Sequence, residues 1–171
     1  MEKGYIQVYT GDGKGKTTAA LGLALRAVCA GKKVYFAQFV KGMDYSELKA
    51  KILLNNLDIH QYGTDCFILN NPTEEDKRIA REGLEAIKKI LSKGEYDVVV
   101  LDEINIALHY KLFSIDEVIE ILKNRKNHVE VILTGRNAHE KIIQLADLVT
   151  EMKEVKHYYE KGVQARIGIE K

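Results

Sequence analysis

Short stretches of apolar, β-branched and aromatic residues recur along the chain, separated by longer segments with helical spacing. These stretches lie at residues 5–9, 34–40, 57–62, 98–101 and 129–133. The stretch at 98–101 contains no polar residue, as expected for a strand that helices cover on both faces. Strands of this kind in alternation with helices predict an α/β protein with a mostly parallel sheet between helical layers.

The ends of several expected helices are marked by capping residues. Residues 17–30 are almost continuously apolar, which predicts a buried helix that ends at Gly31 in the left-handed conformation. Thr73 precedes three acidic residues, a pattern typical of a helix N-terminus, and Gly94 is expected to end that helix. Further helices are expected after a cap at Asp44, from a capping box of Ser114 and Glu117 to about residue 123, and over 137–146.

The C-terminal part predicts two more strands. The first covers residues 148–152. In the second, apolar residues alternate with Gln164, Arg166, Gly168 and Glu170, and the apolar positions are Val163, Ala165, Ile167 and Ile169. A period of two is typical of a strand with one solvated face, so we expect a C-terminal edge strand here.

Composition is that of a globular protein and excludes several kinds of partner. Charged residues make up 30% and hydrophobic residues 46% of the chain, and the length of 171 fits one domain over 1–171. Basic and acidic residues number 26 and 25, so no positive field favours nucleic acid. No signal segment or apolar run of bilayer length is present, so no membrane partner is expected. Cys29 and Cys66 form no CxxC pair, which favours a reducing, cytoplasmic location.

A glycine-rich motif follows the first expected strand and precedes the first helix. Residues 10–18 read TGDGKGKTT and match the P-loop pattern GxxxxGK[ST] except at Thr10. Backbone amides of such a loop and the helix N-terminus bind phosphate, so Lys16 is expected on phosphate and the Thr17 hydroxyl on Mg²⁺. The candidate nucleotide ligands are Gly11, Asp12, Gly13, Lys14, Gly15, Lys16, Thr17 and Thr18. The alternative is a glycine-rich turn with exposed lysines.

Other candidate ligands follow the remaining buried strands. Asp102 and Glu103 follow the stretch at 98–101, where a P-loop protein holds its Mg²⁺ carboxylate. The alternative is that Glu103 only begins the next helix. Arg136 follows a strand and is expected to bind phosphate or hold a carboxylate, and the alternative is a surface arginine before a helix. Lys41 also follows a strand and belongs either to a ligand loop or to a solvated turn. Together these signals predict a P-loop NTPase-like (RecA-like) α/β fold. The histidines are scattered and form no HExxH motif, which argues against catalytic zinc.

Four sequence blocks cover nearly the whole chain in order: GYIQVYTGDGKGKTTAALGLALRAVCAGKKVYFAQFVKG, YDVVVLDEINIALHYKLFSIDEVIEIL, HVEVILTGRNAHEKIIQLADLVTEMKEVKH and GVQARIGIE. In these blocks the chain resembles the P-loop-type corrinoid (cob(I)alamin) adenosyltransferases. The resemblance implies transfer of the 5′-deoxyadenosyl group of ATP to Co(I) of a cobalamin, cobyrinate or cobinamide, with release of triphosphate.

The resemblance also implies roles for individual residues and partners. Lys16, Thr17 and Glu103 would be catalytic, and Mg²⁺ would be held by Thr17 and Glu103 with Asp102. The family binds ATP in a reversed sense in its P-loop, forms a homodimer and receives Co(I) from a flavin-type reductase. Some members carry a Phe-x-Trp pair after the third strand. This chain has no Trp, and Phe67 and Ile68 are the candidates for an apolar wall on the corrinoid side.

Three other functions fit parts of the sequence. A small-molecule kinase or NTPase would use the same P-loop, and it would release ADP rather than triphosphate. A nucleotide-dependent switch or DNA-associated RecA-like module would need the basic surface that the composition does not favour. A corrinoid chaperone would share the site with the transferase.

Overall fold

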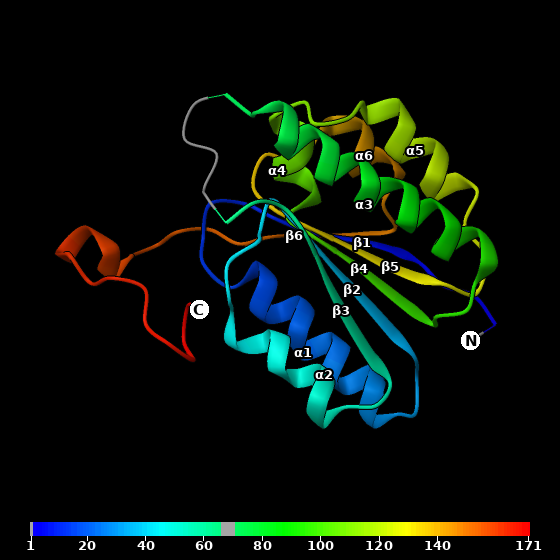
Figure 1. The fold of residues 1–171 in the computed structure, drawn as a ribbon, viewed down its shortest axis with the longest axis horizontal. Helices are drawn as coiled ribbons and strands as arrows, with labels where there is room; N and C mark the ends of the chain where they lie inside the picture. The colour runs from blue at the N-terminus through cyan, green and yellow to red at the C-terminus, as the bar shows by residue number, and fades with distance from the viewer. Residues whose placement is uncertain (1, 66–70) are drawn as a thin grey trace.

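The computed structural model describes residues 2–65 and 71–171 and contains one six-stranded sheet. All neighbouring strands pair in parallel, in the order β3-β2-β4-β5-β1-β6 (Figure 1). The strands are β1 (Ile6–Thr10), β2 (Val34–Phe39), β3 (Leu57–Tyr62), β4 (Val98–Asp102), β5 (Glu130–Thr134) and β6 (Leu148–Glu151).

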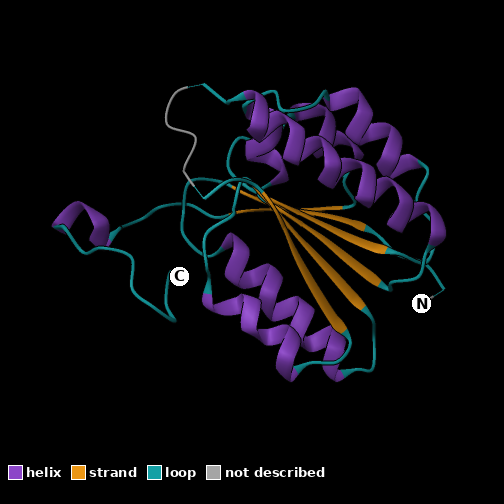
Figure 2. Cartoon of the chain, in the orientation of Figure 1, coloured by secondary structure: helices purple, strands orange, loops and turns teal. Residues whose placement is uncertain are grey.

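Helices cover both faces of the sheet (Figure 2). One face carries α1 (Lys16–Cys29), the 3-10 turn η1 (Ser46–Lys49) and α2 (Ala50–Leu53). The other carries α3 (Glu74–Lys93), α4 (Ile104–His109), α5 (Ile115–Lys123) and α6 (Glu140–Leu145), and the 3-10 turn η2 (Tyr158–Lys161) lies in the C-terminal segment. The predicted three-layer α/β fold is confirmed.

Successive residues of β4 supply the two halves of the core. Val99 and Leu101 pack in the cluster beneath α3 and α5, whereas Val98 and Val100 pack in the cluster beneath α1. Because successive side chains of a strand point to opposite faces, both halves require apolar residues, and this explains the absence of polar alternation.

The predicted caps of the two longer helices on the second face are confirmed. The Thr73 hydroxyl accepts from the Asp76 amide and the Ser114 hydroxyl accepts from the Glu117 amide, each within a full capping box. Gly94 ends α3 with φ 71°. Gly31, just beyond α1, also has a positive φ, of 77°.

Two predictions near the sheet edges are wrong. Asp44 caps no helix, because η1 begins at Ser46 after Tyr45 and has no side-chain cap. Residues 163–169 form loop and turn instead of the expected edge strand. There the amides of Ile169 and Glu170 donate to the Arg166 carbonyl and close a local turn. Alternation of residue types does not itself supply a neighbouring strand, and β6, paired only with β1, is the strand at that edge.

The helices in the described residues include none that is both long enough and apolar enough to cross a membrane.

Candidate functional site

The predicted ligands meet where the parallel strands end. β4 lies between β2 and β5, and β5 lies next to β1, so the loops after these four strands are adjacent (Figure 1). They line a cavity of about 620 Å³. Lining residues that the sequence predicted are Lys14, Gly15, Lys16, Thr17, Thr18, Lys41, Glu103 and Arg136.

The P-loop depends on glycine at two turns and holds its lysine inside. Gly11 and Gly15 have φ values of 93° and 116°, a region that other residues rarely adopt. A Cβ on Gly11 would lie 2.4 Å from the carbonyl oxygen of Met152, the residue after β6, so the end of that strand packs directly on the loop. Lys16 is 7% exposed and its Nζ donates to the carbonyls of Gly11 and Gly13, both at 2.7 Å. Burial lowers the pKa of Lys16, and the nearby carboxylates, Glu103 first, oppose this.

Asp102 is the centre of a hydrogen-bond network at the end of β4. It is fully buried, and its Oδ1 accepts from the hydroxyls of Thr17 at 2.8 Å and Thr134 at 2.6 Å. Its Oδ2 accepts from Lys41 Nζ at 2.7 Å. The network joins the ends of β2, β4 and β5 to the start of α1, and Lys41 belongs to it and not to a solvated turn.

Glu103 both begins α4 and lines the cavity, and its role toward a metal stays a prediction. It is the N-terminal flanking residue of α4, with a φ of 59° that is unusual for a non-glycine. Its amide donates to the Thr134 hydroxyl at 2.9 Å. Burial raises the pKa of the Glu103 carboxyl, as does the charge of Asp102, while Lys41, Lys16 and Arg136 act in the opposite direction.

Arg136 lies against the P-loop. Its Nη2 donates to the Asp12 carbonyl at 3.2 Å, and its Nε is 3.9 Å from Asp12 Oδ1. Asn105, which the sequence analysis missed, donates from Nδ2 to the Gly135 carbonyl at 3.2 Å and so supports the turn before Arg136. Asn105 is fully buried, and its Oδ1 has no hydrogen-bond partner among the described residues. No sequence motif indicates it, because its role depends on contact between the ends of β4 and β5.

The C-terminal segment also lines the cavity, which the sequence analysis did not predict. Residues 168–171 lie at its rim, and the Glu170 carboxylate is 3.7 Å from Lys14 Nζ. The Ser46 hydroxyl donates to the Lys171 carbonyl at 3.0 Å. The predicted corrinoid-side residues Phe67 and Ile68 lie outside the described residues.

The oxygen atoms near Lys41 are of the kind that a magnesium ion prefers. Mg²⁺ prefers oxygen ligands and usually takes one or two carboxylates, with waters and phosphate oxygens in its other positions. Thr17 and Glu103 line the cavity with a hydroxyl and a carboxylate, and the buried Asp102 carboxylate is bonded to the Thr17 hydroxyl. Among residues 2–65 and 71–171 no group of three or more His, Cys, Asp or Glu side chains could hold a metal. A complete protein cage is therefore not the arrangement here.

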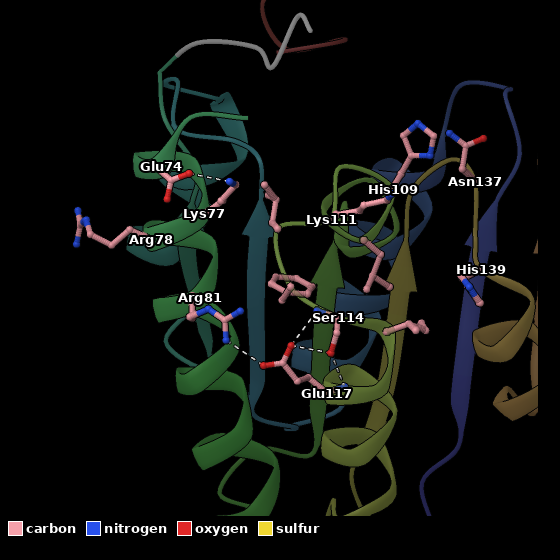
Figure 3. A pocket seen from close by; sticks show the side chains of 14 residues that line it. Glu74, Lys77, Arg78, Arg81, His109, Lys111, Ser114, Glu117, Asn137 and His139 are labelled. Atoms are coloured by element: carbon pink, nitrogen blue, oxygen red, sulfur yellow. Dashed lines mark hydrogen bonds and ion pairs between the residues drawn. The ribbon is translucent and has the colours of Figure 1, made fainter. Parts of the chain in front are cut away.

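A second cavity, of about 970 Å³, lies between α3, α4 and α5 and is lined by none of the predicted ligands (Figure 3). Its cations are largely paired with acids: Lys77 Nζ is 2.7 Å from Glu74, and Arg81 Nη1 is 2.9 Å from Glu117. Its described lining residues include no glycine-rich loop, whereas residues 14–18 of the P-loop line the first cavity, so the P-loop cavity is the better nucleotide site.

The fold and the site define a P-loop nucleotide-binding protein of the α/β class. A family model described as ATP:corrinoid adenosyltransferase BtuR/CobO/CobP matches residues 2–170. The chain is 38% identical over 169 residues to the corrinoid adenosyltransferase of Escherichia coli strain K12, covering 99% of this chain and 86% of that relative. It is 39% identical over 173 residues to the corrinoid adenosyltransferase of a Sinorhizobium species, covering 99% and 81%. The chain belongs to the ATP:corrinoid adenosyltransferase family.

A further relative is the corrinoid adenosyltransferase CobA of Salmonella typhimurium strain LT2. It is 38% identical over 169 residues, and the alignment covers 99% of this chain and 86% of the relative. The family resemblance drawn from the sequence blocks is thus confirmed across the chain.

Proposed function

We propose that this protein transfers the 5′-deoxyadenosyl group of ATP to the Co(I) centre of a reduced corrinoid and releases triphosphate. The observation that carries the proposal is the family match over residues 2–170 in a chain whose P-loop cavity assembles the nucleotide ligands that the sequence predicts. A cobalamin, a cobinamide or a cobyrinate is the acceptor class.

The chemistry suits a site rich in cations and poor in free bases. The electron pair of Co(I) attacks C5′ of ATP, a cobalt–carbon bond forms, and the C5′–oxygen bond breaks with its electron pair leaving on triphosphate. No proton is moved, so no general base is needed. The protein has to hold C5′ in line with cobalt and stabilise the departing charge.

The cations of the cavity supply that stabilisation. Lys16 exchanges the carbonyls of Gly11 and Gly13 for phosphate oxygens, and Lys14 exchanges Glu170 for phosphate. Arg136, held at Asp12, adds a third charge at the loop. Thr17, Glu103 and Asp102 would hold Mg²⁺, which would supply further charge neutralisation on the triphosphate.

We infer two partners for this reaction. A flavin-type reductase is needed because Co(I) has to be supplied by one-electron reduction.

The second partner is another copy of the same chain. Apolar residues exposed in the C-terminal segment support a homodimer, since Val155 is 95% and Ile167 83% exposed. The use of ATP and of a reductant agrees with a cytoplasmic location.

The test is an anaerobic assay with MgATP and chemically reduced cob(I)alamin, in which the cobalt spectrum and the inorganic product are followed. A light-sensitive alkylcobalamin with stoichiometric triphosphate is expected. Formation of ADP and phosphate without a cobalt–carbon bond would establish a kinase or NTPase instead. If Co(I) and ATP both persist, cobinamide and cobyrinate are assayed, and failure with all three contradicts the proposal.

Lys16→Ala is expected to reduce the rate by about 100-fold or more, because it removes a preorganised charge at the phosphates. Lys49→Ala, on η1 and outside the lining of the P-loop cavity, is the matched control and is expected to keep the wild-type rate. Wild-type activity in Lys16→Ala would separate the reaction from the P-loop.

A further inference from the structure

The ammonium group of Lys41 lies among the oxygen atoms that a magnesium ion would use. Its Nζ is 2.7 Å from Asp102 Oδ2 and 3.3 Å from Thr17 Oγ1. The Lys41 side chain is 14% exposed and that of Asp102 is fully buried. Within the described part of the chain, Lys41 is the only cation within ion-pair distance of Asp102. The lysine therefore neutralises a carboxylate that water does not reach.

The backbone around Lys41 fixes this placement. Val40, directly before it, has a φ of 51°, which is costly for a β-branched residue. The Val40 amide donates to the Tyr62 carbonyl at the end of β3. A Cβ on Gly63 would lie 2.3 Å from the Lys41 amide nitrogen, so the two loops pack backbone against backbone. The end of β3 thus orients Lys41 toward Asp102.

The groups around Lys41 favour its charged form. The Asp102 carboxylate lies 2.7 Å from the Lys41 ammonium, and such a close ion pair favours the charged lysine. Glu103 and Glu47 also attract the ammonium, and the Tyr45 ring centroid is 5.4 Å from Nζ. A second cation at Asp102 would therefore be repelled by the Lys41 ammonium at close range.

We propose that Lys41 is a resident cation that occupies the metal-binding oxygens of Thr17 and Asp102 until nucleotide arrives. A divalent ion bonded to Asp102 Oδ2 at about 2.1 Å would lie too near the ammonium, since like charges at such distances repel strongly. The metal therefore enters with the nucleotide, whose phosphates attract the ammonium away from Asp102. The inference rests on the proposed function in one respect, because it takes a complex of a metal ion with a nucleotide as the ligand of this site.

The test measures Mn²⁺, as a probe for Mg²⁺, on protein free of nucleotide and corrinoid, with free Mn²⁺ read by electron paramagnetic resonance. Lys41→Met is expected to bind one Mn²⁺ at least about tenfold more tightly than wild type, because the repelling charge is gone. Adding Asp102→Asn to Lys41→Met is expected to remove the gain. With a non-hydrolysable ATP analogue, wild type is expected to bind Mn²⁺ as well.

Lys14→Met is the matched control, because it removes the same charge from the same cavity without touching Asp102. It is expected to leave Mn²⁺ affinity within about twofold of wild type. Equal Mn²⁺ affinity of folded Lys41→Met and wild type would overturn the proposal.

If circular dichroism shows that Lys41→Met does not fold, Mn²⁺ binding to the wild type tests the proposal. Tight Mn²⁺ binding to nucleotide-free wild type that Asp102→Asn abolishes would also overturn the proposal. Absence of that binding, with its appearance when the ATP analogue is added, supports it. No step of the experiment requires adenosyl transfer, so the outcome is independent of whether the proposed reaction occurs.

Discussion

At the scale of single residues, the site depends on side chains whose neighbours are fixed by other strands. Asp102 accepts hydroxyl donors from Thr17 and Thr134, which are 85 and 32 residues away in the chain. Each of these residues is ordinary in sequence. Their contact, together with the Lys41 ammonium at 2.7 Å, makes a buried carboxylate tolerable, because an unpaired buried charge is strongly destabilising.

Gly11 provides a prediction at this scale. Gly11→Ala is expected to destabilise the protein by about 1–3 kcal/mol, because alanine would be forced to positive φ and against the Met152 carbonyl. Gly22→Ala is the matched control. It lies inside α1 with no atom near its added Cβ, and is expected to stabilise by about 0.4–1 kcal/mol. Urea unfolding measures both, and equal effects of the two substitutions would contradict the account of the loop.

At the scale of elements, caps decide where the helices on the second face begin. In the box that opens α5, hydrogen bonds from Ser114 lower the pKa of Glu117 to about 2. Arg81, on the neighbouring helix α3, also holds this carboxylate, at 2.9 Å. The same side chain thus caps one helix and links it to the next.

Acid is expected to remove the contribution of Glu117 to stability. The folded-state pKa lies below the unfolded value near 4.5, so the stabilisation is complete above about pH 4.5 and is lost as the pH falls toward 2. Since the Glu117 side chain is 42% exposed, solvent screening limits the contribution of its charge to the unfolding free energy to about 1 kcal/mol or less.

The measurement compares urea unfolding of wild type and Glu117→Gln between pH 7 and 2.5. The difference in unfolding free energy is expected to shrink with falling pH. Glu85→Gln, at an exposed position of α3, is the control and is expected to show no such trend. A difference that stays constant across this range would show that the carboxylate charge does not act through the cap.

At the scale of the whole molecule, the C-terminal segment after β6 makes few contacts with the sheet and its helices. It leaves the body beyond β6 and extends to the side on which the strands end (Figure 1). Its last residues return to the P-loop cavity through Lys14 and Glu170. Between these points Tyr159 is 66% and Ile167 83% exposed.

The proposed homodimer is expected to bury this segment. Light scattering after size exclusion is expected to give about twice 19.4 kDa, and Ile167→Asp is expected to shift the protein toward the monomer because a charge at an apolar contact must be desolvated. Lys161→Asp, at a polar position of the same segment, is the control and is expected to remain dimeric. A wild-type mass near 19.4 kDa would contradict the dimer.

Sequence alone determined the elements whose signals are local. Capping boxes at Thr73 and Ser114, the glycine at 94 and the apolar run 98–101 each act within a few residues, and each is confirmed. The P-loop was recognisable for the same reason, since its glycines, its lysine and its helix start are contiguous.

The tertiary structure decided what depends on distant neighbours. Residues 163–169 alternate like a strand, but a strand exists only where another edge pairs with it, and the amides of Ile169 and Glu170 donate to the Arg166 carbonyl in a local turn instead. Whether Lys41 contacts solvent or Asp102 depended on the strand order, which no local pattern specifies. Asn105 became part of the site for the same reason. Local chemistry thus established which groups the chain carries, and strand packing established which of them meet.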